Sequence, residues 1–429
     1  MRTYPGYKDS DVEWIGKIPK GWEIKRFKYS SDFIVEKELP SDGDIKISPE
    51  NVEPYSGKVM NYHSDYETEG MKFREGDTLL NKLRVYLSKF VFCESDGFSM
   101  GEMLVLRPRE YLPKFQYYLL SSPKIIDHFN SLSQGVKVPR PPVNEMLNTL
   151  CPVVPLSEQK QISDYLDRKT QQIDDLSEKT ERKIELLKEQ RSSLINHCVT
   201  KGLDPKVEMK DSGVKWIGEI PRGWEIIPLR YNTKKIGSGV TPRGGSEVYS
   251  ETGIPFLRSQ NIHFRGLSLE DVVYISEEMH ESMSGSKVQS GDVLINITGG
   301  SIGRCCFIND FTKYNVNQHV CIVRPKKQLE TRFLNYFLSS QFGQFQVKLN
   351  ITGSGREGLN FENLGNFSVP KISLPEQKQI SDYLDQETRK IDQMIDTETK
   401  RSNLLKEYRQ SLISSVVTGK IDVRDEVVQ

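Results

Sequence analysis

The charged and nucleophilic residues of this sequence form no recognisable catalytic motif. The triplet 44–46 (Asp-Ile-Lys) contains part of a nuclease site, but such triplets arise by chance in a chain with 28% charged residues. The segment 140–143 (Arg-Pro-Pro-Val) lacks both flanking residues of an amino-methyltransferase tetrapeptide. No Gly-x4-Gly-Lys-Ser/Thr loop for ATP occurs. We therefore expect no catalytic residue in this chain.

Metal and disulfide chemistry are not indicated either. The six cysteines form no Cys-x-x-Cys pair, and with the six histidines they show no zinc spacing. No run of about 18 apolar residues predicts a membrane span, and the first eleven residues lack the apolar core of a signal peptide. We expect reduced thiols in a cytoplasmic protein that binds no metal or cofactor itself. The cysteines are Cys93, Cys151, Cys198, Cys305, Cys306 and Cys321.

Glycine-rich loops with arginine are the first pattern that suits a ligand. Three lie in the second half of the chain, at 237–243, 298–304 and 353–356. Backbone amides exposed by glycine, beside arginine, suit phosphate oxygens and base edges of DNA. For any single loop, an ordinary hairpin turn is an equally good interpretation. In the first half, the loops 82–89 and 135–140 are basic instead. The predicted DNA-contacting residues are Lys82, Arg84, Tyr86, Lys89, Lys137, Arg140, Ser238, Thr241, Arg243, Arg258, Gln260, Asn261, Ser301, Arg304 and Arg356.

The overall charge gives no support for nucleic-acid binding. Lysine plus arginine equals aspartate plus glutamate, 59 of each, so the net charge is zero. A DNA-binding protein usually shows a basic footprint. DNA contact here would therefore depend on local basic patches, or on a partner that shares the neutralisation of the phosphates.

An internal repeat organises the whole chain. The decapeptide EQKQISDYLD occurs at 158–167 and again at 376–385, an offset of 218. A leader at 9–29 returns as a close variant at 211–231, an offset of 202. The order is leader, variable section and repeated segment, twice. Because the offsets differ by 16 (218 − 202), the second variable section is 16 residues longer.

Each repeated segment predicts a long helix. Apolar residues recur at helical spacing over 157–200, and the second segment resembles the first from Pro375 onward. Gly202 and Gly419 are natural stops, and each helix would be roughly 60–65 Å long at about 1.5 Å per residue. One apolar stripe on a helix this long must be buried. We favour an antiparallel pair of the two helices, with pseudo-twofold symmetry, over packing on the helix's own domain. The second stripe is Ile380, Leu384, Ile391, Met394, Leu405, Leu412 and Val416.

The variable sections predict small α+β domains. Strands are expected at 77–83, 90–93, 103–106, 293–298 and 319–323, and helices at 114–121 and 331–339. The two sections share short blocks: residues 76–81 match 291–296, and 106–108 match 323–325. We expect the tryptophans of the leaders, Trp14, Trp22, Trp216 and Trp224, to pack against the helix ends, because sequence-reading residues would differ between copies.

Together these motifs resemble the specificity subunits of type I restriction–modification systems. The resemblance covers essentially the whole chain. It is carried by the repeated decapeptide, the Trp-Ile-Gly-x-Ile-Pro-x-Gly-Trp leader, and the Gly-Asp pairs at 76–77 and 291–292. Further support comes from Gly-Val-Thr-Pro at 239–242, with Gly-Ile-Pro at 253–255. The first section departs from the pattern, because it lacks the Gly-x-Thr-Pro loop.

The resemblance implies a non-catalytic DNA specificity subunit. Its fold would be two similar mixed α/β target recognition domains joined by an antiparallel coiled-coil spacer. Its partners would be double-stranded DNA, two adenine-methylating modification subunits and possibly two restriction subunits. S-adenosylmethionine, ATP and magnesium would belong to those partners. The predicted boundaries are 1–155 (leader and first domain), 156–205 (first helix), 206–372 (leader and second domain) and 373–429 (second helix and tail). Two alternatives remain: a protein-binding assembly scaffold, and a fused restriction or methylation enzyme.

Overall fold

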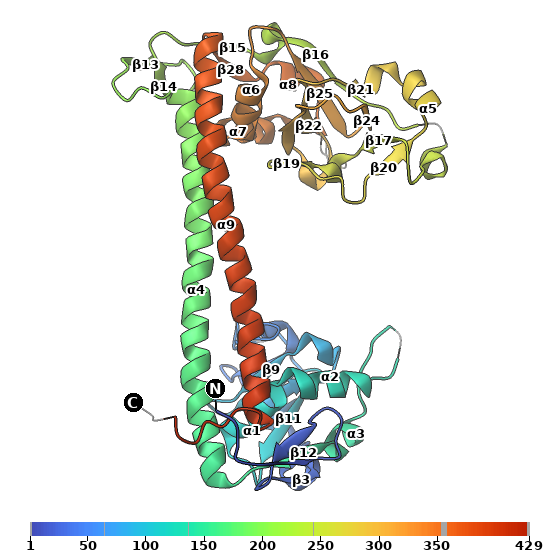
Figure 1. Cartoon of the computed structure of the whole chain (residues 1–429), viewed down its shortest axis with the longest axis vertical. Helices are drawn as coiled ribbons and strands as arrows, with labels where there is room; N and C mark the ends of the chain where they lie inside the picture. The colour runs from blue at the N-terminus through green and yellow to red at the C-terminus, as the bar shows by residue number, and fades with distance from the viewer. Residues whose placement is uncertain (1, 64, 136, 243, 353–357, 427–429) are drawn as a thin grey trace. The chain divides into compact units, whose positions relative to one another are not determined.

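The structure is a computed structural model that describes residues 2–63, 65–135, 137–242, 244–352 and 358–426 (Figure 1). The chain forms two compact units. Unit 1 contains residues 1–182 and 399–429, and unit 2 contains residues 183–398. Both long helices, α4 (Leu156–Lys201) and α9 (Leu374–Val417), therefore contribute a part to each unit. Their 46 and 44 residues correspond to about 69 and 66 Å, slightly longer than predicted.

The first variable domain, in unit 1, is built on two four-stranded sheets. One sheet has the order β4-β11-β8-β9, and the other has the order β5-β7-β10-β6. In the second sheet, β10 and β6 are parallel. The strands are β4 (Ser31–Ile34), β5 (Lys37–Glu38), β6 (Lys46–Ile47), β7 (Gly70–Phe73), β8 (Thr78–Asn81), β9 (Phe90–Phe92), β10 (Gly97–Ser99) and β11 (Met103–Pro108). Three helices follow: α1 (Pro113–Ser121), α2 (Pro123–Ser131) and α3 (Val143–Asn148).

The second variable domain, in unit 2, repeats this architecture with one rearrangement. Its first sheet, β16-β25-β22-β23, matches β4-β11-β8-β9 strand for strand. Its second sheet has the order β20-β17-β24-β21, in which β17 and β24 are the parallel pair. The strands are β16 (Thr233–Ser238), β17 (Ile254–Leu257), β20 (Val273–Ile275), β21 (Lys287–Val288), β22 (Val293–Asn296), β23 (Cys305–Phe307), β24 (Tyr314–Val316) and β25 (Val320–Pro325).

The second domain has further named elements between β17 and β21. They are the hairpin β18 (Ile262–His263) and β19 (Gly266–Leu267), then β20 and α5 (Glu277–Ser282). The fourth strand is consequently added beside the parallel partner β17, whereas in the first domain β5 is added beside β7. The domain ends with α6 (Thr331–Ser339), α7 (Gln341–Asn350), the pair β26 (Ile351–Thr352) and β27 (Gly358–Leu359), and α8 (Phe361–Gly365). The two predicted helices, 114–121 and 331–339, are confirmed as α1 and α6.

Each variable domain is closed by a pair of strands at its two ends. β3 (Glu23–Arg26) pairs antiparallel with β12 (Leu150–Val153), and β15 (Glu225–Pro228) pairs with β28 (Ser368–Lys371). The chain therefore enters and leaves each domain at adjacent positions. We refer to residues 23–153 and 225–371 as the first and second variable domains.

A buried glutamine of the repeated decapeptide fixes the start of each long helix on its own variable domain. The side chain of Gln159 accepts a hydrogen bond from the Leu112 amide at 2.7 Å and donates to the Val154 carbonyl at 2.8 Å. Gln377 makes the equivalent bonds with the Glu330 amide and the Ile372 carbonyl. The alternative of packing on the helix's own domain thus holds for the first turns of each helix.

Beyond these turns, α4 and α9 pair antiparallel in both units. In unit 2, Lys183 pairs with Glu398 and Arg191 with Asp392, so residue numbers rise along one helix as they fall along the other. In unit 1, Arg409 pairs with Asp174 at 2.9 Å.

The Arg409–Asp174 pair is equivalent to the Arg191–Asp392 pair, because Arg409 corresponds to Arg191 (191 + 218) and Asp174 to Asp392 (392 − 218). The pseudo-twofold relationship therefore extends to individual contacts. The pairing confirms the coiled-coil interpretation. The placement of Met394 on the apolar stripe is wrong, because the neighbouring Ile395 fills the seam and Met394 is 43% exposed.

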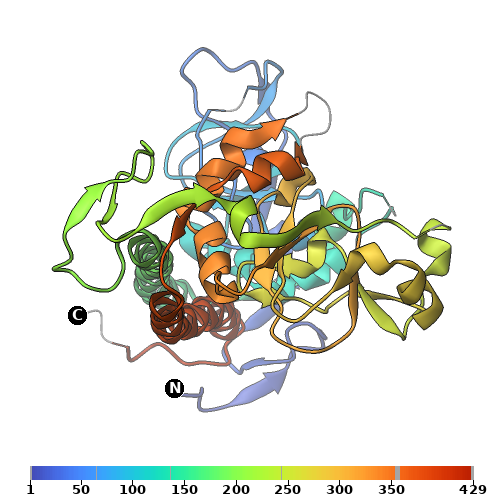
Figure 2. The ribbon, with the colours of Figure 1, turned by 90° about the horizontal axis from the view of Figure 1, so that it is seen from above.

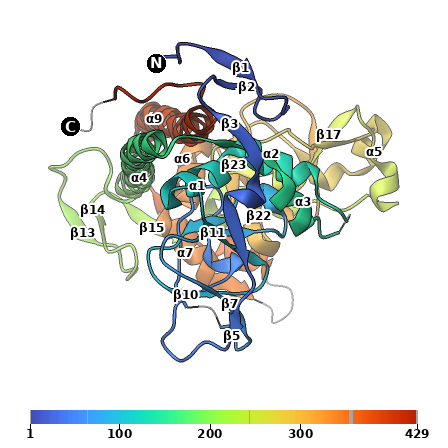
Figure 3. The same ribbon diagram turned by 90° about the horizontal axis from the view of Figure 1, so that it is seen from below.

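The prediction that the leader tryptophans pack against the helix ends is confirmed for Trp22 and Trp224, each at the end of the other copy's helix. It is wrong for Trp14, which stacks on His128 of α2, and for Trp216, which packs against Phe345 of α7. Trp22 is fully buried, and its ring lies beside Gly419 after α9; Trp224 lies beside Gly202 after α4. Figure 3 shows the leader strands β1 (Tyr7–Asp9) and β2 (Lys17–Pro19) beside the last turns of α9. In Figure 2 the second leader hairpin, β13 (Met209–Asp211) and β14 (Glu219–Pro221), flanks the end of α4. Among the described residues, no helix combines the length and apolarity of a membrane span.

Candidate DNA interface

A buried ion pair sets the geometry of the main sheet in each variable domain. Asp292, whose side chain is fully buried, binds Arg324 through two parallel contacts of 2.7 and 2.8 Å. Asp77 and Arg107 form the same pair in the first domain. The two blocks shared between the variable sections, Gly-Asp and Arg-Pro, are therefore two sides of one contact. In the first domain this pair joins the start of β8 to the end of β11, and in the second domain it joins the start of β22 to the end of β25.

In the second domain, a chain of side-chain hydrogen bonds gathers three loops. Thr241 donates to Gln318, the Gln318 amide contacts His319 at 3.0 Å, and His319 contacts the Thr298 hydroxyl at 2.5 Å. The Gly-Val-Thr-Pro loop and the 298–304 loop thereby meet at the loop 317–319. Gly239 is required in this arrangement, because a Cβ there would lie 1.7 Å from the Val316 carbonyl oxygen.

A fourth segment joins through Asn296, at the end of β22. The Asn296 amide nitrogen donates to the carbonyl oxygen of Ser259 at 2.8 Å and to the Ser301 hydroxyl at 3.0 Å. The 3₁₀ turn Ser259–Asn261 is thus held against the glycine-rich loop. These hydrogen bonds link four segments, and one of them, the 298–304 loop, carries the half-buried Arg304. Backbone amides, hydroxyls and arginine are the groups expected to contact phosphates and base edges. The Arg304 guanidinium makes no hydrogen bond or ion pair with any residue that the structure describes.

In the first domain, the two predicted basic loops also meet. The Arg84 amide donates to the Pro139 carbonyl at 3.0 Å, which joins loop 82–89 to loop 135–140. Lys82 and Arg140 both pair with Glu102, at 2.9 and 3.2 Å. Lys89 donates from its ammonium to the Pro49 carbonyl at 2.7 Å. These three cations are therefore engaged within the protein.

The remaining predicted residues fall into three groups. Tyr86, Lys137 and Gln260 are exposed on the loops described above. Ser238 and Arg258 are half-buried, and the Arg258 guanidinium donates to the Asp271 carbonyl at 2.9 Å. Arg243 and Arg356 lie outside the described residues. Contact of any of these residues with DNA stays a prediction.

Asn261 has a structural role that its sequence context did not reveal. It is fully buried; its side-chain oxygen accepts from the Arg258 amide at 2.9 Å, and its nitrogen donates to the Ser268 carbonyl at 3.0 Å. Asn51 accepts from the Ser48 amide in the same way in the first domain. The short segments 48–52 (Ser-Pro-Glu-Asn-Val) and 258–262 (Arg-Ser-Gln-Asn-Ile) are therefore equivalent turns. Their weak similarity was the available signal.

Sequence reasoning also missed the residues that connect the loops, Asn296, Thr298, Gln318 and His319. Asn296 aligns with Asn81 in the shared block before the loop, which was a usable signal. In the first domain, however, the hydrogen bonds of the Asn81 side chain with described residues are local, to the Leu83 backbone. His319 and Gln318 gave no signal, because their neighbours are brought to them by the fold rather than by the sequence.

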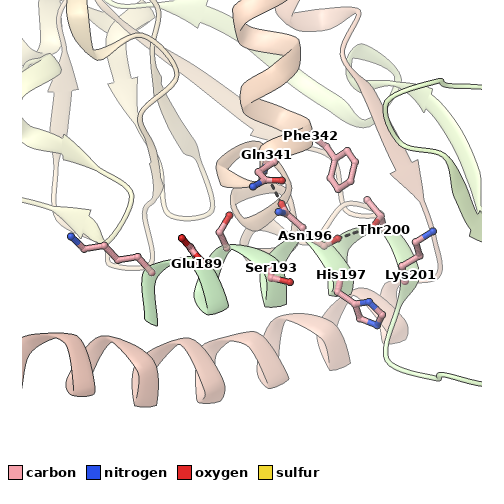
Figure 4. Close-up of a pocket in the computed structure, with 10 residues that line it drawn as sticks. Glu189, Ser193, Asn196, His197, Thr200, Lys201, Gln341 and Phe342 are labelled. Carbon is pink, nitrogen blue, oxygen red and sulfur yellow. Dashed lines mark hydrogen bonds between the residues drawn. The ribbon is translucent and has the colours of Figure 1, made fainter. Parts of the chain in front are cut away.

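A surface hollow in unit 2 shows no catalytic arrangement. It measures about 670 Å³ and is lined by the last turns of α4 and the first residues of α7 (Figure 4). Asn196 links the two sides by accepting a hydrogen bond from the Gln341 amide at 2.8 Å. Among the lining residues, the hydrogen bonds drawn join Asn196 to Gln341 and to Thr200, and none pairs a nucleophile with a base.

The family comparison matches two segments of the chain, one in each copy of the internal repeat. The model of the type I restriction modification DNA specificity domain matches residues 63–186 and 234–407, more than half of the chain. The chain is 23% identical over 427 residues to the type I restriction enzyme MjaVIII specificity subunit of Methanocaldococcus jannaschii, covering 95% of each protein. It is 26% identical over 339 residues to the EcoBI specificity subunit of Escherichia coli, covering 76% of this chain and 68% of that protein.

Solved structures share the fold. One, described as the structural basis of complex assembly and conformational transition of the type I R-M system, matches with a TM-score of 0.72 at 19% identity. It covers 94% of this chain and 99% of the other. The HsdS subunit from Thermoanaerobacter tengcongensis matches with a TM-score of 0.50 at 19% identity, covering 94% and 98%. With two matching domains, two structurally equivalent sheet scaffolds and a paired-helix spacer, the chain belongs to the family of type I restriction–modification DNA specificity subunits.

Proposed function

We propose that this chain reads a bipartite double-stranded DNA site, with one half-site contacted by each variable domain. The observation that carries this proposal is the contrast within each domain. The main sheet, the Asp–Arg pair and the asparagine turn occur in both copies, whereas the gathered loops differ in length, glycine content and charge. Domains that keep one frame and change their loops are suited to read different sequences.

The same arrangement supports a non-catalytic role for the chain. Methylation of adenine requires the base to leave the stack and enter an enzyme pocket. We propose that this pocket, with S-adenosylmethionine, belongs to two modification subunits that dock on the paired helices, and that ATP and magnesium serve restriction subunits. The chain's zero net charge fits this division, because partners surrounding the DNA can neutralise much of the phosphate charge.

An exchange of variable domains tests the proposal. Residues 225–371 are replaced by the corresponding segment of a relative, so that β15 and β28 are exchanged together and keep their pairing. The variant is assembled with its modification subunits, and methylated adenines in random DNA are mapped by single-molecule sequencing. We expect one half of the recognised site to change while the other half is retained.

The matched exchange of residues 23–153 should change the opposite half. A recognised site that is unchanged by both exchanges would contradict the proposal and favour a protein-binding scaffold. As a separate test of the non-catalytic role, the purified chain is incubated with DNA, S-adenosylmethionine and magnesium. We expect neither methylation nor cleavage, and either product would favour a fused enzyme.

A further inference from the structure

The loop after the second strand of the main sheet has one backbone conformation in both domains but two different chemistries. In the second domain, the turn contains Gly299 and Gly303 with φ values of 75° and 88°. At the aligned positions of the first domain, Arg84 and Ser88 adopt φ values of 50° and 49°. These values lie in the left-handed region, which glycine enters freely and residues with a Cβ avoid.

The hydrogen bonds of the two turns are also equivalent. The Leu87 amide donates to the Arg84 carbonyl at 2.8 Å, and the Ile302 amide donates to the Gly299 carbonyl at 3.1 Å. Below them, Asn81 bonds Lys89 as Asn296 bonds Arg304. The two domains therefore share one turn conformation, and the first domain adopts it with Arg84 and Ser88 where the second has glycines. Such strain is retained where the side chain serves a function.

A second surface residue in the left-handed region joins the same turn. Tyr55 has a φ of 66°; its amide donates to the Ser88 carbonyl at 3.0 Å, and its hydroxyl donates to the Tyr86 carbonyl at 3.1 Å. Tyr55 and Tyr86 are 48% and 43% exposed. Among the described residues, three of the five non-glycine residues with positive φ thus lie at this turn, and two exposed tyrosines belong to the same surface segment as Arg84.

Arg84 is the available cation of this surface. Its neighbours Lys82 and Arg140 are both paired with Glu102, and Lys89 is bonded to a backbone carbonyl. The Arg84 side chain is exposed and makes no hydrogen bond or ion pair with any described residue. At the aligned position of the second domain, a Cβ on Gly299 would meet nothing within 4 Å. The position is therefore open to solvent in both domains, since Arg84 is exposed.

From these observations we propose that Arg84 reads a base, most simply a guanine edge in the major groove, within the half-site of the first domain. Arginine pairs with guanine O6 and N7 through two hydrogen bonds, and this contact requires a fixed direction of approach. A phosphate contact needs only nearby charge, which an unstrained lysine elsewhere on the loop would supply. The exposed rings of Tyr55 and Tyr86 belong to the same surface and offer apolar contact to the neighbouring bases. The inference rests on the proposed function and adds a difference between domains: a side chain reads where the second domain presents glycine amides.

The variant Arg84→Gly tests this inference, because it removes the side chain and relieves the backbone at once. Specificity profiles are measured for the complex with its modification subunits, using DNA in which both half-sites are randomised. We expect discrimination to fall by about 10-fold at one base pair of one half-site, with the other half-site unchanged. The melting temperature should not fall, because the released strain offsets the greater unfolded-state freedom of glycine.

Ser88→Gly is the matched control. It relieves the same kind of strain at a side chain that is only 5% exposed, so the profile should be that of the wild type. Uniform weakening of binding by Arg84→Gly, with a shallower salt dependence, would overturn the inference in favour of a phosphate contact. An unchanged profile would also overturn it. If the wild-type profile shows no preference that follows the first variable domain, the proposed function fails instead.

Discussion

Arg324 grips Asp292 through two parallel contacts, Nε to Oδ1 at 2.7 Å and Nη2 to Oδ2 at 2.8 Å, and Arg107 grips Asp77 in the same way. In both pairs the carboxylate is almost completely buried, and the guanidinium is about three-quarters buried. The second oxygen of Asp292 also accepts from the Gln289 amide at 2.7 Å. The aspartate therefore holds two strands and the turn before β22 together.

Replacing Asp292 with asparagine should destabilise unit 2 by about 3 kcal/mol, because the largely buried Arg324 guanidinium is left without its anion. Denaturant unfolding followed by circular dichroism measures the change. Glu225→Gln removes the partner of Lys371 in a fully exposed pair and should have no measurable effect. Equal losses in the two variants would show that the buried pair has no special weight.

Gly239 should be irreplaceable in the Gly-Val-Thr-Pro loop. An added methyl group would overlap the Val316 carbonyl, so Gly239→Ala must displace the loop from Gln318 and His319. We expect recognition of the second half-site to weaken about 10-fold or more, while the first half-site is read normally. Gly237→Ala is the control, since the nearest atom to its added Cβ is 3.9 Å away. The two profiles are compared in the same methylation assay, and identical profiles would contradict the prediction.

The seam between the long helices can be tested with two adjacent leucines. Leu187 packs with Ile391 and Ile395, whereas Leu186 is 48% exposed. Leu187→Ala should cost about 2–3 kcal/mol of unfolding free energy, and Leu186→Ala less than about 0.5 kcal/mol. Thermal and denaturant unfolding of both variants measures this difference. A larger loss of unfolding free energy for Leu186→Ala would mean that Leu186, and not Leu187, is buried between the two helices.

Buried thiols should make the protein lose stability at alkaline pH. Burial raises the pKa of Cys198 to about 11 and the pKa values of Cys306 and Cys321 to about 12. A thiol with a raised folded pKa contributes stability that is complete below its unfolded pKa of about 8.5, and this contribution is lost progressively as pH rises above that value. We expect the unfolding free energy to fall between pH 8 and pH 11.

The change is measured by denaturant titration under reducing conditions. Cys306→Ala lacks one of these groups and should show a shallower decline over the same pH range. A wild-type stability that rises or stays constant from pH 8 to pH 11 would be inconsistent with buried, protonated thiols.

The large-scale organisation could be predicted because the chain is duplicated, and residues that recur in both copies mark the elements that both copies share. Two long helices, their stops at Gly202 and Gly419, and the packing of Trp22 and Trp224 all follow from residues that recur. Gln159 and Gln377 give a structural reason for part of the decapeptide, because their buried side chains bind the backbone of each variable domain.

The candidate site was predictable only in outline. Lys82, Lys89 and Arg140 looked like free cations in the sequence, but Glu102 and a backbone carbonyl engage them through contacts made by folding. The sequence suggested that Asn261 contacts DNA, whereas in the structure its side chain is buried and hydrogen-bonded within a turn. Conversely, Tyr55 and His319 reach their loops from distant positions along the chain. Local pattern cannot reveal such partners, because they depend on how the two sheets bring loop ends together.

The division of the chain into units has a consequence for the order of synthesis. Unit 2 is a continuous stretch, 183–398, so all of its residues are synthesised before residues 399–429, which belong to unit 1. Unit 1 needs its last 31 residues, 399–429, and Leu412, Ile413, Val416 and Val417 complete its core beside Trp22. The first variable domain to be translated is thus the last to be completed. A chain that lacks residues 399–429 would retain all of the residues of unit 2 but would lack part of the core of unit 1.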